Sequence, residues 1–192
     1  NFGVYLVRGN LEERLVARDA ATLEDLMAQF GERSVEKEYL ALCYGRPRFR
    51  SDWVEWRLAP DPQRPNRQRL TRSQGPESRD ARTFWEIVET FEGFALVSAK
   101  PQTGRRHQVR AHLAAVELPV IGDPLYKARN YGPGLLPAGA PAIERTLLHA
   151  WRLAFEHPAT SERLRFEAPP PADFAALTDF LRAQCPPQSQ LP

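Results

Sequence analysis

The chain has 192 residues, of which 42% are hydrophobic and 26% charged, and its formal net charge is +2. This composition supplies a core for one domain and argues against an intrinsically disordered chain. No apolar run is long enough to span a membrane and the first ten residues carry no secretion-signal pattern, so we expect a soluble, cytoplasmic protein. Only two cysteines occur, Cys43 and Cys185, which argues against a disulfide framework and against a zinc site.

The first half of the chain predicts one helix, one strand and a long polar stretch. Leu23, Leu26, Met27 and Phe30 recur at helical spacing, so residues 19–30 predict a helix capped by Asp19 or Thr22 and ended by Gly31. Residues 35–44 alternate between polar and apolar before becoming fully apolar, which predicts a strand. Residues 57–82 are rich in Pro, Arg, Gln and Ser, and they predict an exposed hairpin loop or mobile basic arm.

The second half predicts a mixture of strands and helices. Alternating runs over residues 82–89 and 93–99 indicate an antiparallel pair. The remaining predicted elements are a helix over residues 108–116, strands over residues 146–155 and 163–167, and a helix over residues 173–181. This order indicates a single domain over residues 1–192 with an α+β fold, in which a mixed, mostly antiparallel central sheet is flanked by helices.

The densest group of polar side chains begins at Lys100 and reads Lys-Pro-Gln-Thr-Gly-Arg-Arg-His-Gln-Val-Arg-Ala-His. We refer to it as the arginine motif. Arg105, Arg106 and the backbone N–H groups of the following helix form a candidate site for a phosphate or a carboxylate. A solvated basic helix start is the alternative, and composition alone does not separate the two.

Two shorter stretches follow the arginine motif. Residues 119–126 predict a turn in which Gly122 has a positive φ and Asp123 is structural. Residues 147–153 place His149 and Trp151 in an apolar strand, where a single histidine is usually a hydrogen-bonded, buried polar group.

The order and spacing of these three stretches resemble the RluA-type family of RNA pseudouridine synthases. That family has Lys-Pro-x-Thr-Gly-Arg-x-His-Gln-Ile-Arg-x-His, then Gly-Asp-x-x-Tyr and Leu-His-Ala, and here Val109 replaces the usual Ile. The segment Lys-Glu-Tyr-Leu-Ala from Lys37 is similar to the family's Lys-x-Tyr-x-Ala. The resemblance covers residues 15–181 and implies the pseudouridine synthase catalytic fold.

The resemblance implies an enzyme that isomerises uridine to pseudouridine in a structured ribosomal or transfer RNA, with no cofactor and no metal. By motif match, Tyr39 stacks on the target base and Arg105 lies near the catalytic carboxylate, whereas an ordinary strand aromatic is the alternative for Tyr39. Because the target base must leave its stack, contacts to folded RNA are expected. The candidate RNA contacts are Arg106, His107, Gln108, Arg110, Arg67 and Arg69. We expect a monomer, because the sequence shows no obvious apolar surface stripe.

One part of the family pattern is missing. The family's catalytic Asp lies in a His-Arg-Leu-Asp-x-x-Thr-Ser-Gly segment, which this sequence lacks. Residues 15–19 match the end of the strand that follows that segment, and Val7 stands where the Asp belongs. The residues from Asn1 to Tyr5 resemble a short helical piece upstream of it. We therefore expect an Asp-bearing segment between residues 14 and 15, and further sequence before Asn1, in the complete protein.

Two other interpretations remain open. A genuine deletion of the Asp segment would leave an inactive RNA-binding homologue with a shortened central strand, and we expect such a chain to misfold. A phosphate- or nucleotide-handling enzyme that uses Arg105, Arg106 and His107 would need a glycine-rich phosphate loop or metal-binding carboxylates. The sequence shows neither pattern.

Overall fold

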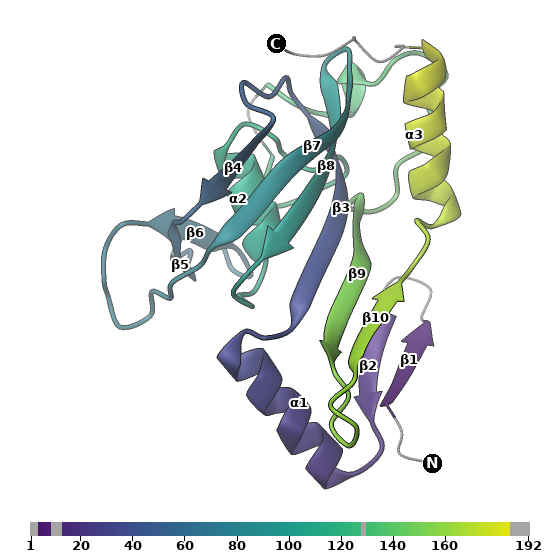
Figure 1. Cartoon of the computed structure of the whole chain (residues 1–192). Helices are drawn as coiled ribbons and strands as arrows, with labels where there is room; N and C mark the ends of the chain where they lie inside the picture. Colours follow the sequence, from purple (N-terminus) through teal and green to yellow (C-terminus); the bar gives the residue numbers. More distant parts are fainter. Residues whose placement is uncertain (1–3, 9–12, 128–129, 185–192) are drawn as a thin grey trace.

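A six-stranded antiparallel sheet forms the centre of the computed structural model, which describes residues 4–8, 13–127 and 130–184. The strand order is β10-β9-β3-β8-β7-β4, and each neighbouring pair runs antiparallel (Figure 1). Its strands are β3 (Glu36–Tyr44), β4 (Ser51–Val54), β7 (Thr83–Phe91), β8 (Phe94–Pro101), β9 (Leu148–Glu156) and β10 (Arg163–Glu167). The helices are α1 (Ala20–Glu32), α2 (Gln108–Ala115), α3 (Ala172–Gln184) and the short 3-10 helix η1 (Pro133–Leu135). The predicted α+β class is confirmed.

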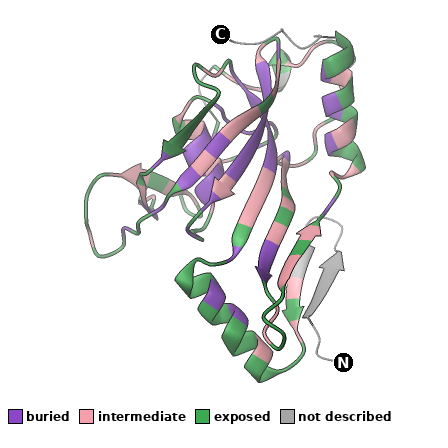
Figure 2. Cartoon of the chain, in the orientation of Figure 1, coloured by how far each residue is buried: buried purple, intermediate pink, exposed green. Residues whose placement is uncertain are grey.

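Alternation along β3 explains why helices cover both faces of the sheet. Successive strand residues point to opposite faces. Ala41 and Cys43 belong to a buried cluster that includes Val109 and Leu113 of α2. The other face is formed by Leu40, Leu42 and Tyr44, which pack with Phe174, Leu177 and Leu181 of α3. Figure 2 shows the buried residues concentrated along β3, β7 and β8 and on the inner sides of α2 and α3.

Helix α1 begins and ends with recognisable caps. The Asp19 side chain accepts a hydrogen bond from the backbone N–H of Thr22 at 2.8 Å, as expected of an N-cap. The helix continues past Gly31 and ends at Arg33, whose φ is 64°, so the predicted stop at Gly31 is two residues early. Only Leu26 of its predicted apolar face is buried; Leu23, Met27 and Phe30 are exposed. These three residues form an exposed apolar stripe on α1. We expected a monomer because the sequence showed no such stripe, so the reason for that expectation no longer holds.

The N-terminal strands form a separate sheet. Strand β1 (Val4–Arg8) pairs antiparallel with β2 (Glu13–Ala17), so the helical piece expected at Val4 and Tyr5 is wrong. Asn1 to Gly3 lie outside the described residues. Residues 15–17 pair with β1 and therefore do not belong to the central sheet. In this chain the link between residues 14 and 15 lies inside β2.

Of the two alternatives predicted for residues 57–82, the structure agrees with the hairpin and not with the mobile arm. Strand β5 (Arg57–Pro60) pairs with β6 (Gln68–Thr71) in a hairpin, which we call the basic arm. Its few apolar side chains decide the structure, because Leu58 is 2% exposed and clusters with Ala111 of α2 and with Tyr126. Four apolar residues among many polar ones gave a weak sequence signal, but they are enough to anchor the hairpin on α2.

The other predicted elements occur within a few residues of their expected bounds, whereas β1, β4 and η1 were not predicted. A four-residue strand gives little periodicity to detect. Cys43 lies buried in β3, while Cys185 lies outside the described residues. Within the described ranges, no helix is both long enough and apolar enough to cross a membrane.

Candidate active site

The arginine motif divides into a buried half and an exposed half. Thr103, Gln108 and His112 are at most 4% exposed, whereas Arg105 and Arg106 are exposed. The exposed arginines lie between Thr103 and Gln108, and the left-handed backbone of His107 (φ 56°) turns the chain from them into α2. The buried side chains therefore hold the backbone that presents the exposed arginines.

The Gln108 amide ties the motif to the start of β7. Its oxygen accepts hydrogen bonds from the Thr103 hydroxyl at 2.7 Å and from the backbone N–H of Arg105 at 3.1 Å. Its nitrogen donates to the carbonyl of Arg82 at 3.0 Å and to the hydroxyl of Thr83 at 2.9 Å. These four bonds use the full capacity of the amide. Gln108 was a candidate RNA contact, but in this structure it lies away from the surface and positions Arg105.

The buried His112 extends the same network. Its Nε2 lies 3.1 Å from the carbonyl of Trp56, which only accepts, so Nε2 carries the proton and Nδ1 accepts from the Thr83 hydroxyl at 2.9 Å. Burial lowers the pKa of His112 to about 4, although the bond to Trp56 opposes that shift. The ring is therefore neutral at pH 7, and it serves as a hydrogen-bonded link between α2, β7 and the segment before β5.

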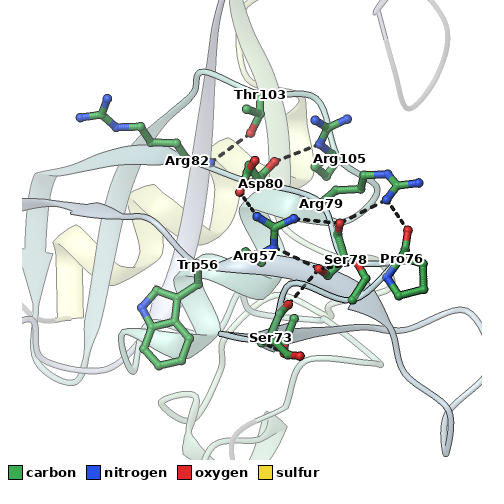
Figure 3. A network of polar contacts seen from close by, with 12 residues as sticks. Trp56, Arg57, Ser73, Pro76, Ser78, Arg79, Asp80, Arg82, Thr103 and Arg105 are labelled. Atoms are coloured by element: carbon green, nitrogen blue, oxygen red, sulfur yellow. Dashed lines mark hydrogen bonds and ion pairs between the residues drawn. The ribbon is translucent and has the colours of Figure 1, made fainter.

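Arg105 is held by one nitrogen of its guanidinium. Its Nε donates to the backbone carbonyl of Asp80 at 3.0 Å (Figure 3). The Asp80 carboxylate pairs instead with Arg57, whose Nε donates to the Ser78 hydroxyl at 3.0 Å. Among the residues that the structure describes, the two terminal nitrogens of Arg105 have no hydrogen-bond partner. A guanidinium with this fork unoccupied is suited to a carboxylate or a phosphate.

Tyr39 lies on the α2 face of the sheet, half-buried in β3. It pairs with Ala99 of β8 and with Ala150 of β9, and the pairing with β9 shifts register immediately before it. Irregularities of this kind are common next to active sites. Tyr39 packs against the buried cluster that contains Val109 of α2. Tyr39 and the arginine motif thus border the same face of the sheet.

Arg110 and Asp123 form a buried, two-pronged ion pair. Arg110 Nε and Nη2 donate to the Asp123 carboxylate at 2.6 and 2.7 Å, and the Asp123 side chain is 1% exposed. Burial favours the neutral acid, but the bonds from Arg110 and from the backbone N–H groups of Leu125 and Tyr126 outweigh it and lower the pKa of Asp123. Asp123 therefore closes the turn after Gly122, whose φ is 76°. Asp123 therefore neutralises the charge of Arg110 within the protein.

Tyr126 anchors the basic arm against the start of α2. Its hydroxyl accepts from the backbone N–H of Gln68 at 2.8 Å and lies 3.3 Å from His107 Nδ1. The guanidiniums of Arg67 and Arg110 lie 5.4 and 5.1 Å from its ring centre, within cation–π range. The pKa of His107 is lowered by burial and by the neighbouring charges of Arg110 and Arg106.

The structure brings four of the six candidate RNA contacts together. Arg67, Arg106, His107 and Arg110 meet where the basic arm packs on α2, and Arg106 donates to the Asn66 side chain at 3.2 Å. Arg69 is exposed on β6, and Gln108 is buried. Sequence reasoning missed Trp56, Asp80 and Thr83, because their roles depend on contacts between distant segments. His149 Nε2 donates to the Ala168 carbonyl at 2.9 Å.

A search for metal ligands gives no candidate within the described part of the chain. No group of three or more His, Cys, Asp or Glu residues there is arranged to hold a metal ion.

Comparisons with known proteins agree with the resemblance in sequence. The family model described as RNA pseudouridylate synthase matches residues 14–115. Ribosomal large subunit pseudouridine synthase D of Nitrosomonas europaea is 34% identical over 169 residues, which are 88% of this chain and 47% of that protein. The uncharacterized RNA pseudouridine synthase YlyB of Bacillus subtilis is 31% identical over 168 residues, 88% of this chain and 51% of that protein.

A solved structure has the same fold. Human RNA pseudouridylate synthase domain containing 1 superposes with a TM-score of 0.71 at 26% sequence identity, covering 99% of this chain and 76% of that one. The chain spans about half the length of the curated relatives it matches. Because the family model matches more than half of the residues, including both Tyr39 and the arginine motif, the chain belongs to the RNA pseudouridine synthase family.

Proposed function

We propose that this chain is part of an enzyme that isomerises uridine to pseudouridine in RNA. The observation that carries the proposal is the Arg105 guanidinium, which is held by Nε alone on a backbone fixed by Gln108. Its free fork fits the carboxylate that the reaction needs. The relatives whose names specify a substrate are ribosomal large subunit enzymes, which favours ribosomal over transfer RNA.

The reaction exchanges one bond to the ribose for another. The bond between N1 of uracil and C1′ breaks, the base turns within the site, and C5 joins C1′. The proton on C5 is lost to solvent and N1 gains one, so no oxidant, metal or cofactor is consumed. Tyr39 stacks on the base while it turns, and Arg105 stabilises the ionised catalytic carboxylate.

The catalytic carboxylate is the missing component. We propose that the complete protein carries it in an Asp-bearing segment between residues 14 and 15, preceded by further sequence. Mass spectrometry of the protein purified from its source tests this directly. A peptide containing His-Arg-Leu-Asp would support the segment, and peptides that run without interruption through residues 14 and 15 would contradict it.

The RNA contacts that we propose come from arginines around the basic arm, of which Arg106 and Arg69 are exposed and Arg67 is half-buried. Arg106, Arg67 and Arg69 contact the phosphate backbone, while His107 and Arg110 support them from beneath through Tyr126. Cytoplasmic location and the monomeric state also stay predictions. Fractionation checks the first, and analytical ultracentrifugation checks the second.

Release of label from RNA carrying uridine tritiated at C5 tests the activity, because forming the C5–C1′ bond frees that hydrogen. We expect release from a ribosomal RNA fragment with the complete protein, and none after Arg105→Ala, which should leave folding intact. Full activity in Arg105→Ala would contradict the assignment of the site. Tight RNA binding without release by the wild-type protein would indicate the inactive homologue.

A further inference from the structure

Two exposed tryptophans, each beside an arginine, lie along the outer edge of the central sheet. Trp53, in the edge strand β4, is 37% exposed, and Trp56, just beyond that strand, is 41% exposed. The guanidinium carbon of Arg82 lies 4.1 Å from the Trp53 ring centre, and that of Arg72 lies 4.9 Å from the Trp56 ring centre. We call these four residues the edge surface.

We propose that the edge surface binds unpaired nucleotides of the RNA that flank the target uridine. Aromatic rings beside cations are the usual platform for single-stranded nucleic acid, because bases stack on the rings and phosphates approach the cations. This inference rests on the proposed function, and it adds a binding site outside Tyr39 and the arginine motif.

The charges along this edge favour RNA as the occupant. Residues 51–82, which include both tryptophans, contain seven arginines against five acidic residues. Three of the five acids are already paired, Asp61 with Arg67, Asp80 with Arg57 and Glu55 with Arg82. The excess of positive charge complements a polyphosphate chain, and it would repel a basic partner.

One carboxylate competes for the edge surface. Glu55 lies 2.6 Å from Arg82 Nε, and the two side chains are 58% and 47% exposed. Exposed ion pairs of this kind contribute little. A phosphate can therefore replace Glu55 at Arg82 without a large loss, so the pair does not block the surface.

The edge surface shares its backbone with the network that holds Arg105. The Trp56 carbonyl accepts from His112, the Arg82 N–H donates to the Thr103 hydroxyl at 3.0 Å, and the Arg82 carbonyl accepts from Gln108. Figure 3 shows Arg82 joined to Thr103 next to Asp80 and Arg105, while the Trp56 ring lies apart from them, beyond Arg57. Nucleotides held at Trp53 and Trp56 are thereby placed in fixed register with the candidate active site.

Binding of two RNAs by the complete protein tests the inference. Both RNAs contain one stem-loop with the target uridine, and only the second carries six unpaired nucleotides at each end. Fluorescence anisotropy at one fixed salt concentration gives both dissociation constants. We expect wild type to bind the extended RNA more tightly, and the double variant Trp53→Leu, Trp56→Leu to lose roughly tenfold in affinity for the extended RNA alone.

Phe30→Leu is the matched control. Phe30 is 42% exposed and lies 5.5 Å from the Lys37 ammonium, so it is also an exposed aromatic beside a cation, but on α1. It should bind both RNAs like wild type. Arg72→Gln removes an exposed cation without touching the core, and should weaken binding of the extended RNA several-fold. If the double tryptophan variant unfolds at a lower temperature than wild type, its loss of affinity has a second explanation, and the affinity of Arg72→Gln for the extended RNA tests the inference instead.

The outcomes separate this inference from the proposed function. Equal binding of both RNAs by wild type, with no effect of Arg72→Gln, would overturn the edge surface and leave the proposed function intact. An equal loss in Phe30→Leu would also overturn it, because stacking would then be nonspecific. Binding of neither RNA would contradict both proposals, and would point to a protein as the partner of the exposed tryptophans.

Discussion

Stability should fall between pH 7 and pH 5 because of one buried side chain, His112. Its pKa is lowered to about 4 in the folded protein, compared with about 6.5 for an unfolded chain. The folded state thus keeps His112 neutral where the unfolded state binds a proton. The contribution of His112 to stability is complete above the unfolded pKa and is lost as the pH falls towards the folded pKa.

The size of the effect follows from the two pKa values. Proton binding by the unfolded chain lowers the free energy of unfolding by about 2 kcal/mol between pH 7 and pH 5. For a domain of this length, that corresponds to a melting temperature lower by roughly 4–8 °C. The cost arises because a protonated ring could no longer accept from Thr83 while it stayed buried.

Urea unfolding of wild type and His112→Gln at pH 7 and pH 5 measures the effect. Glutamine cannot be protonated, so the variant should lose about 2 kcal/mol less than wild type across that interval, whatever its stability at pH 7. His157→Gln, in the turn between β9 and β10, is the control and should behave like wild type. An identical loss in wild type and His112→Gln would show that His112 is not the group responsible.

Further predictions follow from other contacts. Asp123→Asn should destabilise the protein by about 3–5 kcal/mol in urea unfolding, because it leaves the Arg110 charge buried without its partner. Tyr126→Phe should lower stability by about 1 kcal/mol and make the Gln68 amide exchange faster with deuterium, because that N–H loses its acceptor. Arg106→Gln should reduce the slope of log affinity against log salt concentration by about 1 for any RNA, since an exposed arginine contacts phosphate rather than bases.

Trp151 shows where the sequence pattern overstates burial. Its apolar surroundings predict a core residue whose loss would cost about 3–5 kcal/mol. The side chain is only partly buried, beside the core cluster, and the Arg152 guanidinium lies 3.4 Å from its ring centre. Trp151→Ala should therefore cost less than that range. The pairing between β3 and β9 shifts register at Trp151, between the partners of Glu38 and Tyr39. Alternation in the sequence could not predict the partial exposure of Trp151, because such a shift depends on how the two strands pair.

The buried half of the arginine motif shows what sequence can and cannot predict about a site. Chemistry alone grouped Arg105 with Arg106 as a candidate anion site, and the resemblance to the pseudouridine synthase family singled out Arg105. The same reasoning grouped Gln108 with the exposed residues, although its amide is used up by Thr103, Arg82 and other partners. Hydrogen bonds between segments 26 residues apart leave no periodic trace in the sequence. Which polar residues face inward is settled only when β7 and α2 pack.

The basic arm is a segment whose structure depends on contacts with residues far away in the sequence. Its polar composition left open whether the segment forms a hairpin loop or a mobile arm, and the four apolar residues within residues 57–82 are a weak signal for strands. The stabilising contacts come from outside, where Tyr126 accepts from Gln68 and Ala111 packs on Leu58. The turn that carries Tyr126 is held by the ion pair between Arg110 and Asp123. Because Gln108 and Arg110 both belong to α2, one helix fixes the position of Arg105 and of the basic arm.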